Sequence, residues 1–340
     1  MRKSRYFIIG IVLLLLCFLG TAMAMEVKIS YNGPPDPKTN AVHAYAVRLK
    51  KLIEEGTNGR IKLVLFPNSQ LGKEEERMDL TRNMPIMNIA SYAGMAPLFP
   101  ELYAASIPFM FDSYKAAHIF FDESEYWKKA QEAFKKRTGV VLLEAIEEGG
   151  FLAFTNSKRE IHSPKDFKGL KFRAMDEGQV IIYKAMGASG VPIPWTELYM
   201  ALKTGVVDGQ MNPPMYIIIG SLYEVQKYMT MANVQYSDQF LVANAKWFDS
   251  LSPEDRKVIL EAAKKANIIN RKEVESMVDK RVQFLKDKGM KVYYPTKEEM
   301  EQFRKTVQPA YVNWLKKKIG EYWLDLALKC AKIANEKAAK

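Results

Sequence analysis

The feature that most constrains this chain is a long helical pattern near its C-terminal end. Between residues 253 and 288, apolar residues recur every three or four positions among charged ones. Ser252 is a suitable N-cap, and Pro253 suits the first helical position. An unbroken helix here would be roughly 54 Å long at 1.5 Å per residue, longer than a small domain is wide. The pattern predicts a helix that crosses two domains, with a break near Asn267 or Asn270 as the alternative.

The N-terminal part of the chain alternates strand and helix patterns. Residues 26–31 and 60–66 read as strands, and apolar residues between Val42 and Ile53 recur at helical spacing. Strand, helix and strand in about 40 residues form a βαβ unit, which favours a parallel sheet covered by helices. Further elements are expected as a helix at 73–84, a strand near 86–91, a helix near 114–135 and strands at 139–145 and 170–174. The pattern predicts an α/β protein, and the length of 340 residues suggests two domains of ordinary size or one large one.

The first 24 residues have the features of a secretory signal peptide. Three basic residues precede an apolar run from Phe7 to Leu19, and Ala22 and Ala24 offer small residues for cleavage. The run is shorter than the roughly 20 residues that a membrane-spanning helix needs. We expect export to the periplasm through a cleavable signal at 1–24; an uncleaved anchor is the alternative.

The positive net charge does not point to nucleic acid. The chain has 50 Lys+Arg against 39 Asp+Glu, a charge of +11. The leader contributes three basic residues, so 47 minus 39 leaves +8, scattered over helix faces and interleaved with Glu. A nucleic-acid surface needs clustering with aromatic residues. Of two Cys, Cys17 lies in the leader and Cys330 remains, which excludes a disulfide framework.

Sequence motifs for catalysis are absent. The chain has no G-x-S-x-G, G-x-G-x-x-G, P-loop or H-E-x-x-H pattern. His43, His118 and His162 are far apart in sequence, and the pair Glu147–Glu148 is interpreted as a solvated face. We therefore predict no catalytic residues, no metal site and no cofactor.

Residues 163–214 carry the most informative motifs. Arg173 lies at the end of the strand expected at 170–174. Its planar guanidinium can bind a carboxylate through two parallel hydrogen bonds, and strand ends at an interdomain crevice are where α/β proteins bind ligands. Most arginines are solvated, however, so position alone leaves a surface role open.

A family resemblance extends this interpretation. The run GLKFRAM, followed by PWTELYMALKTGVVDGQMNP, closely resembles the solute-binding subunits of tripartite ATP-independent periplasmic (TRAP) transporters, the DctP family. YNGPPDP at 31–37, GRIKLVLFPNSQLG at 59–72, IPFMF at 107–111 and YEVQKYMT at 223–230 agree with the family in the same order. The resemblance covers about residues 26–320.

The resemblance implies an α/β, two-domain periplasmic binding protein with an interdomain cleft and a long helix spanning both domains. One domain is expected from 26–150 plus about 238–280, and the other from 151–237 plus about 281–320. Residues 321–340 are expected to form a C-terminal helical tail.

The resemblance also implies site residues. Arg173 is expected to pair with a substrate carboxylate, and Asn212 to reach the same group. Trp195 is expected to line the pocket, although a plain core position is its alternative. Asn32 and Glu74 are expected to contribute from the other domain.

Departures from the family pattern bear on the ligand. Many members carry a second Arg where this chain has Leu152 and Ala153. A single cation argues for a single buried carboxylate, because an unpaired one is costly to desolvate. The other pocket candidates are apolar or aromatic: Tyr92, Met175, Met211 and Tyr236. We expect a monocarboxylate with an apolar or aromatic body; a C4-dicarboxylate and a sugar acid are the alternatives.

The expected function is capture of an organic acid without catalysis. A ligand that contacts both domains stabilises their closed arrangement, which the permease subunits of the transporter then recognise. We expect a monomer with no cofactor and no nucleic-acid partner. A ligand sensor of the same fold and an exported enzyme are the competing functions.

Overall fold

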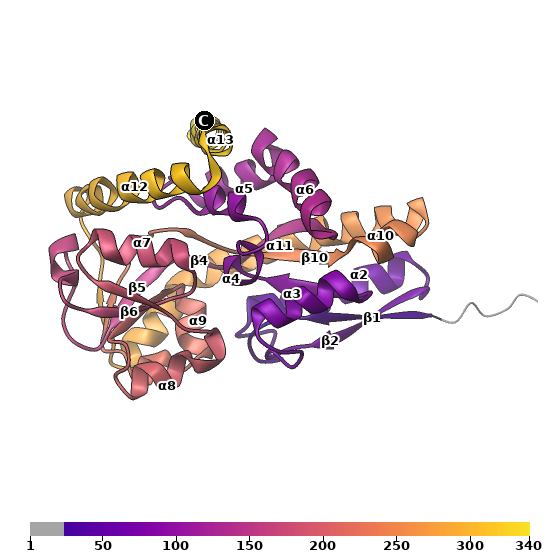
Figure 1. Cartoon of the computed structure of the whole chain (residues 1–340). Coiled ribbons are helices and arrows are strands. Elements are labelled where there is room, and N and C mark those ends of the chain that lie inside the picture. The colour runs from indigo at the N-terminus through magenta and orange to yellow at the C-terminus, as the bar shows by residue number, and fades with distance from the viewer. Residues whose placement is uncertain (1–23) are drawn as a thin grey trace, which may run out of the picture.

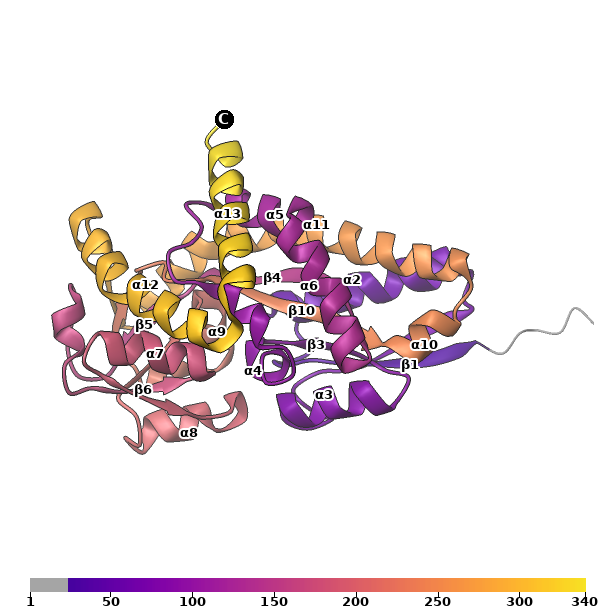
Figure 2. The same cartoon turned by 45° about the horizontal axis from the view of Figure 1, so that its top comes forward.

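The computed structural model describes residues 24–340, which form two lobes, each built on its own β-sheet (Figure 1). The predicted signal peptide falls almost wholly on residues 1–23 and lies outside the described residues. The lobe containing β1 to β3 and the lobe containing β5 to β8 lie side by side in both views (Figures 1 and 2). The expected two-domain α/β fold is confirmed.

The first sheet has the strand order β2-β1-β3-β10-β4. Its strands are β1 (Met25–Ser30), β2 (Ile61–Phe66), β3 (Met87–Ala90), β4 (Val140–Phe151) and β10 (Tyr236–Asn244). β1 pairs in parallel with both β2 and β3, which confirms the predicted βαβ unit. β10 is antiparallel to β3 and β4, so the sheet is mixed.

The second sheet has the order β11-β9-β5-β8-β6-β7. Its strands are β5 (Ala153–Asn156), β6 (Lys171–Ala174), β7 (Ser189–Pro192), β8 (Gly209–Asn212), β9 (Tyr228–Thr230) and β11 (Lys291–Tyr293). The chain passes between the sheets after β4 and again before β10. At this crossing Leu152 N donates to Gln235 O at 2.9 Å, and Val234 N donates to Leu152 O at 3.2 Å. The two connections are therefore hydrogen-bonded to each other.

Helices pack on both sheets and around their junction. They are α2 (Ala41–Gly56), α3 (Glu74–Asn83), α4 (Tyr92–Met95), α5 (Tyr114–Glu123), α6 (Glu125–Thr138), α7 (Glu177–Ala185), α8 (Leu198–Lys203), α9 (Pro214–Ile219), α10 (Ala245–Ser250), α11 (Pro253–Asp287), α12 (Lys297–Ile319) and α13 (Glu321–Ala338). Figure 2 shows α13 beside α5 and α6, against which it packs. No helix within the described chain is long and apolar enough to span a membrane.

Helix α11 is continuous over 35 residues and joins the two lobes. It packs against α2 and β4 of the first lobe and against α9 and β11 of the second. The Ser252 hydroxyl caps its first turn by accepting from Asp255 N at 3.0 Å. Asn267 and Asn270 do not break it, because their side chains donate to the backbone carbonyls of Ala145 (2.7 Å) and Glu147 (2.6 Å) in β4.

Two expected elements differ from the structure. The single helix predicted near 114–135 is two helices, α5 and α6, separated at Ser124. Ser124 has extended backbone angles, and its hydroxyl caps α6 by accepting from Trp127 N at 3.1 Å. The strand predicted at 139–145 continues to Phe151, so its last residues reach the junction of the lobes.

Candidate functional site

A cavity of about 300 Å³ lies between the lobes and is lined by residues of both. Asn32 follows β1 and Ser91 follows β3, two parallel strands whose carboxyl ends meet at one edge of the first sheet. From the second lobe, Arg173 projects from β6 and Asn212 from the end of β8. The cavity therefore lies where carboxyl ends of strands from both sheets face each other.

The structure brings six of the nine predicted site residues to this cavity. They are Asn32, Glu74, Arg173, Met175, Trp195 and Asn212. The other three, Tyr92, Met211 and Tyr236, line a smaller adjoining cavity of about 30 Å³ instead. Met175 and Asn212 border both cavities, so the smaller one is a side chamber of the larger.

Arg173 is the buried cation of the cavity. It is 3% exposed, and its Nε donates to the carbonyl of Ile193 at 2.8 Å, which fixes the plane of the guanidinium. Burial lowers its pKa, although a guanidinium remains charged at neutral pH. No residue in 24–340 forms a salt bridge with it. Its terminal nitrogens can therefore hold a carboxylate in the cavity through charge-assisted hydrogen bonds.

The first lobe contributes a wall of pre-formed hydrogen bonds. Asn32 Nδ2 donates to Glu74 Oε1 at 2.6 Å, and Asn32 Oδ1 accepts from Arg77 Nη1 at 2.9 Å and from Ser69 Oγ at 2.8 Å. The other Glu74 oxygen accepts from both the backbone N and the hydroxyl of Ser91, at 2.8 and 2.7 Å. Asn32 and Glu74 thus hold each other in place, and hydrogen bonds from Ser69, Arg77 and Ser91 fix their orientation.

Trp195 forms an aromatic wall on the second lobe. Its ring meets that of Tyr216 edge-on, with centroids 4.8 Å apart and planes at 84°. Trp195 is only half-buried and lines the cavity, so it is not a plain core residue. A flat indole face of this kind can pack against the apolar side of a ligand.

Sequence reasoning missed Glu148, Tyr216 and Gln239, which line the same cavity. Gln239 Nε2 donates to Glu148 Oε1 at 3.2 Å and to the Tyr216 hydroxyl at 2.8 Å. Burial raises the pKa of Glu148 to about 8. The interpretation of Glu147–Glu148 as a solvated face is wrong, because both residues are buried. Extending the predicted strand beyond residue 145 would have placed them in a buried strand.

In the side chamber, the hydroxyl groups of two tyrosines donate hydrogen bonds to buried carboxylates. Tyr92 OH donates to Asp238 at 3.2 Å, and Tyr236 OH donates to Glu147 Oε2 at 2.9 Å. Burial raises the pKa of Asp238 well above its ordinary value. These hydroxyl groups are occupied within the protein, which leaves the larger cavity as the principal binding space.

Comparisons with known proteins agree with this architecture. Residues 34–318 match the family described as bacterial extracellular solute-binding protein, family 7 (DctP). The chain is 31% identical over 268 residues to the sialic acid-binding periplasmic protein SiaP of Vibrio cholerae, covering 78% of this chain and 82% of that protein. It is 30% identical over 262 residues to the 2,3-diketo-L-gulonate-binding periplasmic protein YiaO of Escherichia coli, covering 76% and 79%.

A solved structure of a family relative has the same fold. The sugar acid binding protein DctPAm of Advenella mimigardefordensis, in complex with galactonate, superposes with a TM-score of 0.84 at 31% identity, covering 92% of this chain and 99% of that one. The resemblance to TRAP solute-binding subunits is confirmed, and this chain belongs to family 7 of the bacterial extracellular solute-binding proteins.

Proposed function

We propose that this protein binds a hydroxylated monocarboxylate of the sugar-acid class in its interdomain cleft and delivers it to the membrane subunits of a TRAP transporter. The observation that carries the proposal is the buried Arg173, which has no salt-bridge partner among residues 24–340 and lines the same cavity as a set of carboxyl and amide groups. One such cation matches one carboxylate, as a second would be buried without a partner.

The polar wall favours hydroxyl groups on the ligand body. Glu74 and Glu148 bring acceptor oxygens to the cavity, and Asn32 and Gln239 bring amides. An apolar body would cover these groups and leave the lone pairs that face the cavity unsatisfied, whereas hydroxyl groups can donate to them. Trp195 can then pack on the C–H face of the same ligand. The sugar-acid alternative therefore fits better than the apolar monocarboxylate expected from sequence.

The relatives support this choice of class. SiaP and YiaO are named for sialic acid and 2,3-diketo-L-gulonate, and DctPAm holds galactonate. Each of these ligands combines a single carboxylate with several hydroxyl groups. We propose that the present protein shares this class while differing in the particular acid.

The proposal also covers the export of the protein, its oligomeric state and the fate of its ligand. We propose that residues 1–24 direct export to the periplasm and are cleaved, and that the mature protein is a monomer. We further propose that it releases its ligand chemically unchanged, because the cleft serves binding and closure. Recovery of unaltered acid after prolonged incubation with the protein tests this last point.

A calorimetric comparison of three ligand classes tests the proposed function. Galactonate and D-erythronate represent sugar acids, phenylpyruvate an apolar monocarboxylate and succinate a dicarboxylate. We expect a sugar acid to bind at least about tenfold more tightly than either other class, which corresponds to about 1.4 kcal/mol. Tighter binding of phenylpyruvate or succinate would overturn the assignment of the class.

A further inference from the structure

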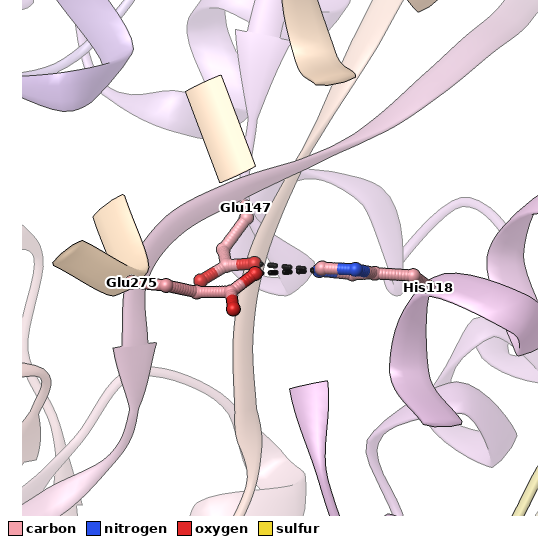
Figure 3. A group of neighbouring side chains, drawn as sticks. All are labelled: His118, Glu147 and Glu275. Atoms are coloured by element: carbon pink, nitrogen blue, oxygen red, sulfur yellow. Dashed lines mark hydrogen bonds and ion pairs between the residues drawn. The ribbon is translucent and has the colours of Figure 1, made fainter. Parts of the chain in front are cut away.

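A cluster of metal-ligating side chains lies outside the cleft and joins three elements. His118 comes from α5, Glu147 from β4 and Glu275 from α11. His118 Nε2 lies 2.8 Å from Glu147 Oε2 and 3.5 Å from Glu275 Oε1. Figure 3 shows both glutamates directed at the same ring nitrogen. One ligand atom from each residue lies within 4.8 Å of the others.

These spacings suit a shared small cation. Ligand atoms at about 2.0–2.2 Å around a tetrahedral zinc ion stand roughly 3.3 Å from one another. The two distances from His118 Nε2, 2.8 and 3.5 Å, lie on either side of that value. The third pair of ligand atoms lies within 4.8 Å, and an ion between the three side chains would replace the His118–Glu147 hydrogen bond.

Glu147 supplies a second, independent observation. Its side chain is completely buried, and its Oε1 has no hydrogen-bond partner within residues 24–340, whereas its Oε2 contacts His118 Nε2 and the Tyr236 hydroxyl. A buried carboxylate oxygen without a partner is costly, and such atoms are uncommon in proteins. The carboxylate of Glu275 faces the same point, so two negative charges converge in a partly desolvated place. A bound cation would stabilise the carboxylates of both Glu147 and Glu275.

The neighbouring arginines form no salt bridge with the Glu147 carboxylate within the described residues. Arg271 is engaged by Asp122, with Nη1–Oδ2 and Nη2–Oδ1 distances of 2.7 and 3.0 Å. Arg281 is buried on α11 near Glu147, yet the two form no salt bridge within the described chain, and its Nη1 also lacks a partner. Within residues 24–340, neither arginine therefore forms a salt bridge with Glu147, whose Oε2 contacts only His118 Nε2 and the Tyr236 hydroxyl.

We propose that His118, Glu147 and Glu275 form a binding site for a divalent transition-metal ion of the zinc class. One imidazole nitrogen with carboxylate oxygens suits Zn²⁺, Co²⁺ or Mn²⁺, whereas Ca²⁺ and Mg²⁺ prefer oxygen ligands alone. His118 and Glu275 are partly exposed, so an ion can enter and water can complete its coordination. The ion would tie α5 and α11 to β4, next to the crossing between the lobes.

The test uses tag-free protein stripped of metal with a chelator and then titrated with ZnCl₂ by calorimetry. We expect one ion per chain, and binding of Co²⁺ with the visible absorption of a nitrogen- and oxygen-ligated ion. His118→Ala and Glu275→Gln should each weaken zinc binding by at least about tenfold, since loss of even an outer-shell partner costs that much. Glu275 lies on a helix surface, so we expect the Glu275→Gln variant to fold even if the His118→Ala variant does not.

A matched control is His162→Ala. The His162 side chain is 44% exposed and lies 3.2 Å from the carboxylate of Glu160, so it reports histidine-dependent surface binding. Its loss should leave the stoichiometry and affinity unchanged. Absence of zinc binding to the wild-type protein, equal affinity in the His118 and Glu275 variants, or loss of binding in the control would each overturn the proposal.

Discussion

Lys73 and Glu197 form a salt bridge between the two lobes, with Lys73 Nζ 2.6 Å from Glu197 Oε1. Lys73 precedes α3 in the first lobe, and Glu197 follows Trp195 in the second. Both side chains are about half exposed, and Lys73 borders the cavity. The pair therefore links the lobes at the solvent side of the cleft, where opening would separate it.

This pair predicts a modest effect on ligand release. Glu197→Gln removes an attraction that exists only while the lobes are together, so the closed state loses population. We expect the ligand dissociation rate to rise by about two- to fivefold, as is typical for an exposed ion pair, and the effect to shrink at high salt. Stopped-flow fluorescence measures this rate. Glu55→Gln, which alters the exposed pair with Lys51 on α2, serves as the control and should change nothing.

Arg173→Ala is predicted to abolish useful ligand affinity while leaving the fold intact. Removing one partner of a buried charge pair costs about 2–5 kcal/mol, or at least about 30-fold in Kd. Arg173→Lys should recover only part of this, because an ammonium cannot form the paired hydrogen bonds of a guanidinium. Calorimetry gives Kd, and Arg82→Ala on α3 is a control for loss of a surface arginine. Wild-type affinity in Arg173→Ala would disprove its role in ligand binding.

Glu148 predicts a pH dependence of stability. Its pKa is raised from 4.5 to about 8 by burial in the folded protein. Between these values the folded state holds a proton that the unfolded chain has released, so this group lowers stability as pH rises from about 4.5 to about 8. Below that window its contribution is constant and most favourable.

Glu148→Gln should remove this contribution. The wild-type free energy of unfolding should fall relative to that of the variant by up to about 1.4 kcal/mol per pH unit within the window. Urea unfolding at pH 5, 6.5 and 8 measures the difference, which includes the repulsion between Glu148 and the buried Asp238 that the variant also removes. Glu75→Gln, at an exposed position, is the control. Parallel pH curves for wild type and Glu148→Gln would contradict the prediction.

Local pattern was enough to predict much of the fold and part of the site. The apolar period of residues 253–288 predicted α11 because a helix this long shows its periodicity over many turns. Arg173 and Asn212 could be placed at the cleft because strand ends and a family motif coincide there. The break at Ser124 was missed, since a serine in a helical pattern is compatible with both continuation and capping.

The missed site residues share a different cause. Glu148 and Gln239 are 91 positions apart and meet only because β4 and β10 pair across the sheet. Nothing in the local sequence of either residue distinguishes a carboxylate or amide facing a cavity from one facing water. Their role depends on tertiary register, which a single sequence does not reveal. The wall of polar groups in the cavity with Arg173, on which the proposed hydroxylated ligand rests, therefore required the structure.

Asn270 gives a final prediction, concerning the helix that joins the lobes. Its Nδ2 donates to the backbone carbonyl of Glu147 at 2.6 Å, at a place where α11 packs on β4. Asn270→Ala leaves that buried carbonyl without a partner, so we expect a loss of about 1–3 kcal/mol in the free energy of unfolding. Alanine favours the helix, so helical circular dichroism should not fall. Lys272→Ala, on the exposed side of the same helix turn, should change stability by less than about 0.5 kcal/mol. If both variants unfold at the same urea concentration as the wild type, the Asn270 hydrogen bond does not hold the helix to the strand.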